Sequence, residues 1–170
     1  MTVRKFRLFI APNIDKEEQW ITEMSRKGLH LVKYEYFTYV FEEDPTKSYV
    51  YQIDFRQEAK RDYFQLYEDA GWEYVTNSMS IFHYFRADSS EASVQKLYTD
   101  NESIQDSFKR MISFYLLIFG LFLVSQLGLV VSWKGYLIQY IVAGMDIVFI
   151  VLYLYLFYAI NKRIDFYRRK

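Results

Sequence analysis

The chain has 170 residues, no cysteine, 52% hydrophobic and 21% aromatic residues, and 21 basic against 21 acidic side chains. This composition excludes collagen-like, disordered and disulfide-stapled proteins, and the length suits one modest domain with an appendage. The zero net charge conceals a division, because residues 1–108 carry 13 basic and 19 acidic side chains whereas residues 109–170 carry 8 and 2. Two unlike halves are therefore joined in one chain.

The first half opens with the pattern of a strand, a helix and a hairpin. Residues 6–10 alternate between apolar and other side chains as a strand does. Asp15 and Glu18 have the spacing of an N-cap and its capping-box partner, and Gly28 suits the left-handed position that follows a helix. The aromatic-rich stretch 29–41 is long enough to fold back on itself as a hairpin.

A turn-rich join over residues 43–48 leads to a second set of the same elements. Residues 49–55 show the cleanest strand alternation in the chain. Residues 60–70 predict an amphipathic helix that ends at Gly71, and residues 72–85 again suit a hairpin.

The two sets of elements indicate an internal repeat, because Gly28 and Gly71 lie 43 residues apart. The same offset relates two further pairs, Ile10 with Ile53 and Val32 with Val75. We therefore predict that residues 1–87 form an α+β domain, a duplicated strand-helix-hairpin in a ferredoxin-like two-layer sandwich. Both helices would cover one face of an antiparallel sheet.

The other face of that sheet has no obvious cover and is a candidate aromatic binding face. Its five residues are Tyr34, Tyr36, Trp72, Tyr74 and Tyr84. The alternative is that these rings are half-exposed residues that strengthen cross-strand pairing. Nucleic acid is disfavoured as a partner, because phosphate would be repelled by the acidic first half, so a protein, peptide, small cationic or apolar ligand is expected.

Catalytic signals are weak. His30 and His83 stand alone rather than at metal-ligand spacing, and no phosphate loop or nucleophile elbow is found. Glu35, Asp54 and Glu73 could converge across the sheet as a carboxylate pair, although such side chains are more often solvated or paired with lysines. We predict no catalytic residue, metal or cofactor.

The second half has the pattern of a transmembrane hairpin. Residues 88–108 are a polar linker in which Thr99 and Glu102 predict the start of a juxtamembrane helix near Asp100. Within residues 109–170, two apolar spans follow, 111–133 and 136–160, each long enough to cross a bilayer. The flanking basic residues are Lys109, Arg110, Lys162, Arg163, Arg168, Arg169 and Lys170, with Lys134 alone in the turn. This distribution predicts a multi-pass cell-membrane protein with both termini in the cytoplasm.

Asp146 lies about midway along the second span, where an ionised carboxylate costs roughly 2.5–3.5 kcal/mol on insertion scales. Gln139 and Tyr153 stand seven residues on either side of it, so the three share a helical stripe that Gln126 of the first span could meet. This polar stripe could be a proton or substrate path or a contact with another membrane protein. The favoured interpretation is that this stripe holds the two helices of the hairpin together or forms a homo-oligomer contact.

Four segments of the chain resemble the bacterial, membrane-anchored domain-of-unknown-function family DUF2812. They are Trp20–Leu31 (WITEMSRKGLHL), Tyr49–Asp54 (YVYQID), Tyr67–Val75 (YEDAGWEYV) and Leu97–Ser103 (LYTDNES). The resemblance covers most of residues 4–108 in order. It implies a cytosolic α+β domain fused to membrane spans, and it implies no catalytic residue.

These patterns together favour a non-enzymatic integral membrane protein whose cytosolic domain binds a protein partner or ligand, in signalling or envelope-stress response. In the alternative, the hairpin is the working part of a transport or toxin-immunity component.

Overall fold

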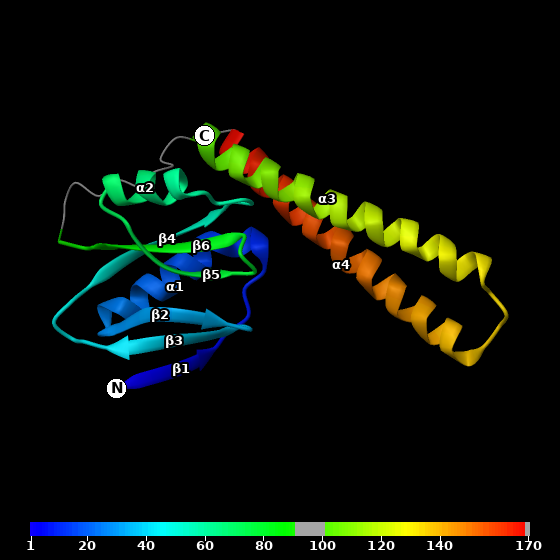
Figure 1. Ribbon diagram of the computed structural model, residues 1–170, viewed down its shortest axis with the longest axis horizontal. Helices are drawn as coiled ribbons and strands as arrows, with labels where there is room; N and C mark the ends of the chain where they lie inside the picture. Colours follow the sequence, from blue (N-terminus) through cyan, green and yellow to red (C-terminus); the bar gives the residue numbers. More distant parts are fainter. Residues whose placement is uncertain (91–100, 169–170) are drawn as a thin grey trace. The chain divides into compact units, whose positions relative to one another are not determined.

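The computed structural model describes residues 1–90 and 101–168, and the chain forms two compact units, Met1–Ser103 and Ile104–Lys170. The elements of the first unit are β1 (Thr2–Phe6), a 3₁₀ turn η1 (Ala11–Asn13), α1 (Ile14–Arg26), β2 (Leu29–Glu35), β3 (Thr38–Glu43), β4 (Tyr49–Phe55), α2 (Arg61–Asp69), β5 (Glu73–Ser78) and β6 (Phe82–Asp88) (Figure 1). Two long helices follow, α3 (Asn101–Val131) and α4 (Leu137–Arg168).

The strands form two antiparallel sheets of three strands each, in the orders β1-β3-β2 and β4-β6-β5. In both sheets the last strand of the repeat lies in the centre, between the strand before the helix and the strand after it. The α+β class and the duplicated strand-helix-hairpin unit are therefore confirmed.

The offset of 43 residues recurs in the backbone. Gly28 and Gly71 both follow a helix with positive φ, at 78° and 82°. The register shift between Leu31 and Lys33 of β2 corresponds to the shift between Tyr74 and Thr76 of β5. In the same way, the positive-φ turn residues Tyr36 and Phe37 correspond to Met79 and Ser80. Gly28 is also required sterically, because a Cβ there would lie 3.0 Å from the Cα of Pro45.

The start of the chain differs from the prediction. The first strand spans Thr2–Phe6 instead of residues 6–10, and Ile10 lies in the loop that follows, so the pairing of Ile10 with Ile53 of β4 has no structural counterpart. The N-cap of α1 is Asn13, not Asp15. Pro12, within η1, explains the earlier start, because its fixed φ favours helical backbone in a first turn.

The two sheets do not merge into the single sheet that we expected, so a ferredoxin-like arrangement is not confirmed. Where β2 approaches β5, the Tyr34 N–H donates to the Thr76 side-chain hydroxyl over 3.4 Å instead of joining a backbone ladder. The strand irregularities beside Leu31 and Tyr74 fall on these same two edge strands. A bulge interrupts the regular donor pattern that a shared ladder needs.

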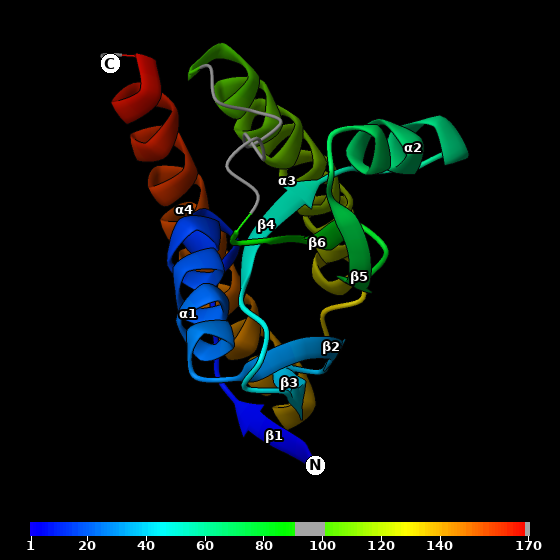
Figure 2. The ribbon, with the colours of Figure 1, turned by 90° about the vertical axis from the view of Figure 1, so that its left-hand side faces the viewer.

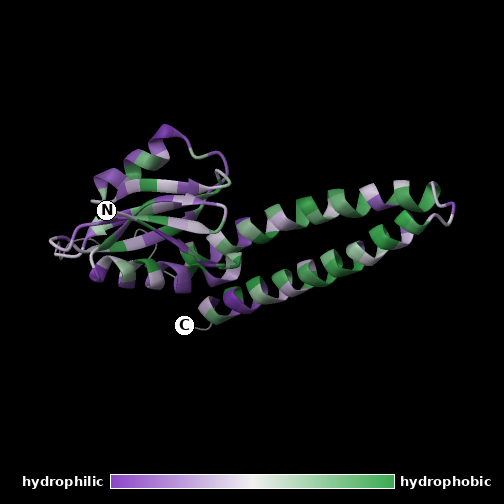
Figure 3. Cartoon of the chain, turned by 90° about the horizontal axis from the view of Figure 1, so that it is seen from below, coloured by the Kyte–Doolittle hydropathy of each residue, from purple (hydrophilic) through white to green (hydrophobic). Residues whose placement is uncertain are grey.

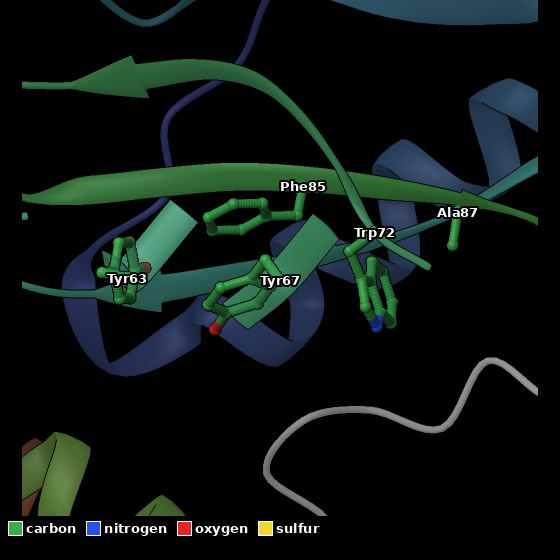
Figure 4. Close-up of a cluster of buried hydrophobic side chains, with 5 residues drawn as sticks. All are labelled: Tyr63, Tyr67, Trp72, Phe85 and Ala87. Carbon is green, nitrogen blue, oxygen red and sulfur yellow. The ribbon is translucent and has the colours of Figure 1, made fainter. Parts of the chain in front are cut away.

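Helix α1 contacts both sheets, whereas α2 covers only the second (Figure 2). On α1, the Trp20 ring packs on Tyr39 of β3 with centroids 4.8 Å apart. On α2, the Tyr67 ring stacks on Phe85 of β6 with centroids 3.7 Å apart. The buried cluster under α2 consists of Tyr63, Tyr67, Trp72, Phe85 and Ala87 (Figure 4). Strand β4, which lies against α1, is almost completely buried.

The helices α3 and α4 of the second unit form a hairpin whose surface is predominantly apolar (Figure 3). At 1.5 Å per residue they are about 46 and 48 Å long, more than a bilayer core of about 30 Å requires. Helix α3 begins at Asn101 and continues without a break into the apolar stretch. The predicted linker falls partly on residues 91–100, and this part, with Thr99 and Asp100, lies outside the described residues.

Candidate functional site

The predicted aromatic binding face does not form one exposed surface. Tyr84 and Trp72 are each 3% exposed. Tyr34 is half-buried and its ring stacks on Tyr84 with centroids 5.6 Å apart. Tyr36 and Tyr74 remain exposed, Tyr36 in the β2–β3 turn and Tyr74 on β5 against Phe64 of α2.

What the structure brings together instead is a buried junction around Glu17 of α1. The hydroxyls of Tyr39 on β3 and Tyr84 on β6 both donate to Glu17 Oε1, each over 2.6 Å. The two tyrosines belong to different sheets and different repeats. One carboxylate, 8% exposed, therefore joins the two halves of the first unit.

Burial dominates the electrostatics of this junction. Desolvation raises the pKa of Glu17 above its usual value of 4.5, and the two tyrosine hydrogen bonds oppose that rise. Burial, and then the charge of Glu17, also raise the pKa of Tyr39 and Tyr84 well above the usual value. Both phenols therefore stay protonated and serve as donors. The junction is a satisfied internal hydrogen-bond centre rather than a nucleophile with its base.

A second polar row on α1 covers the free edge of β4. Glu18 Oε1 accepts from the Ile53 N–H over 2.8 Å. In the same way, Thr22 Oγ1 accepts from the Tyr51 N–H over 3.1 Å and Ser25 Oγ accepts from the Tyr49 N–H over 2.8 Å. Every second strand N–H thus meets successive turns of the helix, so the edge offers few free donors to another strand.

His30 extends this row to the join between the repeats. Its Nε2 lies 2.7 Å from the Asp44 carbonyl oxygen, which can only accept, so Nε2 carries the proton. Its Nδ1 then accepts from the Ser25 hydroxyl at 2.8 Å in the neutral tautomer. His30 lies on β2 and His83 on β6, so both histidines are sheet residues.

A third polar group lies under α2, where Asp54 and His83 are cross-strand partners. The Tyr63 hydroxyl donates to Asp54 Oδ2 over 2.9 Å, and His83 Nε2 donates to the Arg56 carbonyl oxygen over 3.1 Å. Burial lowers the pKa of His83, so its ring is neutral at pH 7. Its Nδ1 is buried without a hydrogen-bond partner in the described part of the chain.

The other carboxylates proposed from sequence do not converge with Asp54. Glu35 pairs with Lys33 on its own strand, and Glu73 forms a two-pronged ion pair with Arg86 at 2.8 Å. Across residues 1–90 and 101–168, no three His, Asp or Glu side chains lie close enough to hold a metal ion.

Gln139 of the predicted polar stripe has a local role. Its Oε1 accepts from the N–H groups of Lys134 and Tyr136, and its Nε2 donates to the Ser132 carbonyl oxygen, over 2.9 to 3.1 Å. It therefore holds the turn between α3 and α4 instead of facing Asp146.

The other stripe residues are not joined by contacts. Tyr153 packs on Phe119 of α3 with centroids 5.0 Å apart, and Gln126 bonds to the neighbouring Ser125. Asp146 is half-buried, and no hydrogen-bond or ion-pair partner for it lies within the described residues.

Sequence reasoning missed the Glu17 junction, although one signal for it exists. Glu17 stands three, four and seven residues before Trp20, Ile21 and Met24, so it occupies the apolar stripe of its helix. A carboxylate on such a stripe needs an internal partner. Its partners lie 22 and 67 residues away, which no local pattern reveals.

One family model matches the chain. The model described as "Protein of unknown function (DUF2812)" covers residues 13–120. No curated protein and no solved structure gave a match. The match spans the first unit from the start of α1 and extends into α3.

Replacing Glu17 with Gln should change how stability depends on pH. Because burial raises the pKa of Glu17, the stability it provides is present below pH 4.5 and is lost as the pH rises through that raised pKa. The difference in unfolding free energy between the native protein and Glu17→Gln should fall by about 1.4 kcal/mol for each unit by which the pKa is raised.

Urea unfolding of the full chain in detergent measures this difference. A Trp133→Phe background leaves Trp20 and Trp72, both in the first unit, as the fluorescent reporters. Glu17→Ala, which leaves two buried hydroxyls unpaired, should lose about 2–5 kcal/mol below pH 4.5, where the stability that Glu17 provides is fully present. Parallel pH profiles for the native and Glu17→Gln proteins would show that Glu17 does not titrate as described.

Proposed function

Because this chain belongs to the DUF2812 family of proteins of unknown function, we propose that it is a non-enzymatic membrane protein whose first unit is a binding or regulatory module on the cytoplasmic side of a cell membrane. The observation that supports this best is the second unit. Two helices there are long and apolar enough to cross a membrane, and the most apolar window of each has no buried residue.

The exposure of these helices argues against a role as core helices of a water-soluble protein. Leu117, Val124, Ile147 and Val151 are each between 59% and 65% exposed, and many similar side chains surround them. Apolar patches of this extent on soluble proteins mark contacts with lipid or with another protein. A bilayer covers both helices along most of their length.

The first unit supports binding over catalysis. Its buried acids Glu17, Glu18 and Asp54 each accept a hydrogen bond from another element of the fold, and so they act as structural acceptors. The proposed partner of the module is a protein, with signalling or envelope-stress response as its setting. Neither a nucleic acid nor a cofactor is part of the proposal.

The charges beside the helices set the proposed orientation. Lys109 and Arg110 lie before the first apolar span and Lys162 and Arg163 after the second, whereas the turn carries Lys134 alone. Basic residues are retained on the cytoplasmic side of a membrane. Both termini should therefore be cytoplasmic.

Single-cysteine labelling tests this orientation, because the chain contains no cysteine of its own. Lys134→Cys should react with a membrane-impermeant maleimide added to spheroplasts. Lys16→Cys and Arg168→Cys, both at exposed positions, should react only after lysis. Reaction of Lys16→Cys from outside would place the first unit on the wrong side for this proposal.

Asp146 favours a second candidate, a transport or toxin-immunity component that works through the hairpin, since a half-buried carboxylate in an apolar helix marks a functional site by default. In that case native proteoliposomes should pass protons, Asp146→Asn should reduce the flux at least about tenfold, and Gln126→Leu should keep it. Under the leading proposal, the proton flux of proteoliposomes with the native protein or either variant does not exceed that of empty liposomes. Asp146→Asn then lowers only the oligomeric mass, which light scattering in detergent measures. Flux that needs Asp146 would select the second candidate.

A further inference from the structure

One surface of the first unit combines exposed apolar rings with basic side chains. It lies where the end of β1 meets the β2–β3 turn, and we call it the apolar tip. Its apolar members are Phe6 (74% exposed), Leu8 (61%), Tyr36 (93%) and Phe37 (45%). They are neighbours in space, because Phe6 pairs with Thr38 across the sheet and the Arg7 N–H donates to the Phe37 carbonyl oxygen over 3.0 Å.

The charge of the apolar tip is opposite to that of the unit that carries it. The first fourteen residues contain Arg4, Lys5 and Arg7 and no acidic side chain, within a half of the chain that has an excess of acids. The carboxylate of Glu35, at the end of β2, is ion-paired with Lys33, which compensates its negative charge, and this pairing, together with the charge of Arg4, keeps the pKa of Glu35 below its usual value.

The backbone of the turn adds a second observation. Tyr36 and Phe37 both have positive φ, at 43° and 64°, in a two-residue loop between the paired residues Glu35 and Thr38. Such a turn favours Asn-Gly, and bulky residues in this conformation are strained. Two exposed aromatic rings therefore occupy positions where the fold alone would favour Asn and Gly.

We propose that the apolar tip docks on the anionic lipid headgroups of the bilayer in which α3 and α4 are anchored, an inference that rests on the proposed membrane function. The cytoplasmic leaflet carries negative lipids that attract basic segments, and aromatic rings enter the boundary between headgroups and acyl chains. Because the same chain is tethered to that bilayer, its headgroups are present at a high effective concentration. The acidic remainder of the unit is repelled by the same surface, which orients the tip toward it.

Hydrogen exchange of the full chain in lipid nanodiscs tests this docking. Backbone amides of residues 1–10 and 34–38 should exchange at least about fivefold more slowly in discs that contain phosphatidylglycerol than in discs of phosphatidylcholine alone, a factor expected for one basic side chain at an anionic surface. The double variant Tyr36→Asn/Phe37→Gly should lose this protection. Since it installs the preferred turn pair, its loss cannot be attributed to unfolding.

The repeat supplies the matched control. Met79→Asn/Ser80→Gly makes the same change in the equivalent turn, where both residues also have positive φ, and should keep the protection. Equal exchange rates in the two kinds of disc would overturn the docking, whether the amides are protected in both or in neither. Protection in both is expected if the tip packed on its own helices or on a second copy. Extraction of the chain from the discs by alkaline carbonate would instead contradict the proposed membrane function.

Discussion

Helix α1 provides the interaction on which the first unit depends. Each repeat supplies only three strands, and a sheet of that size needs an apolar face and covered edges to be stable. The Glu17 carboxylate binds a tyrosine from each sheet, while Glu18, Thr22 and Ser25 occupy the N–H groups along β4. One helix therefore satisfies polar groups of both repeats, and the second helix, α2, needs to cover only one face.

This arrangement explains why so few interior polar groups are available for chemistry. Buried carboxylates become reactive when their donors are missing or when a base or nucleophile shares the site. Here Glu17 accepts hydrogen bonds from protonated phenols, the polar row on α1 accepts from backbone N–H groups, and Asp54 accepts from the Tyr63 hydroxyl. The features that point outward are the apolar tip and the exposed helices of the second unit, which is why the proposals concern binding and membrane attachment.

Much of the fold could be predicted, because it follows from local patterns. Strand β4 spans the predicted residues 49–55 since its alternation is regular, and Gly28 and Gly71 end helices since both need positive φ. The two apolar helices follow from their length and lack of charge. The separation into two sheets could not be predicted, because it depends on how the edges of β2 and β5 meet.

The candidate site was harder to predict, because its contacts are tertiary. Tyr84 and Trp72 have the pattern of surface aromatics, yet Tyr84 is buried against Glu17 and the Tyr34 ring, and Trp72 is buried in the cluster under α2. Gln139 looked like an intramembrane polar residue, although its spacing from the turn also fits the cap that it forms. The partners of Glu17 cannot be predicted from local patterns, because both tyrosines are distant from it in sequence.

A double-mutant cycle between Tyr39→Phe and Tyr84→Phe tests most directly whether α1 joins the two repeats. The two hydroxyls meet at Glu17, so their effects on the unfolding free energy of the full chain should be coupled by about 0.5–3 kcal/mol. The coupling should vanish when the cycle is repeated in the Glu17→Ala background. Additive effects in the native background would contradict the account, because they would mean that the two hydroxyls do not act through one shared carboxylate.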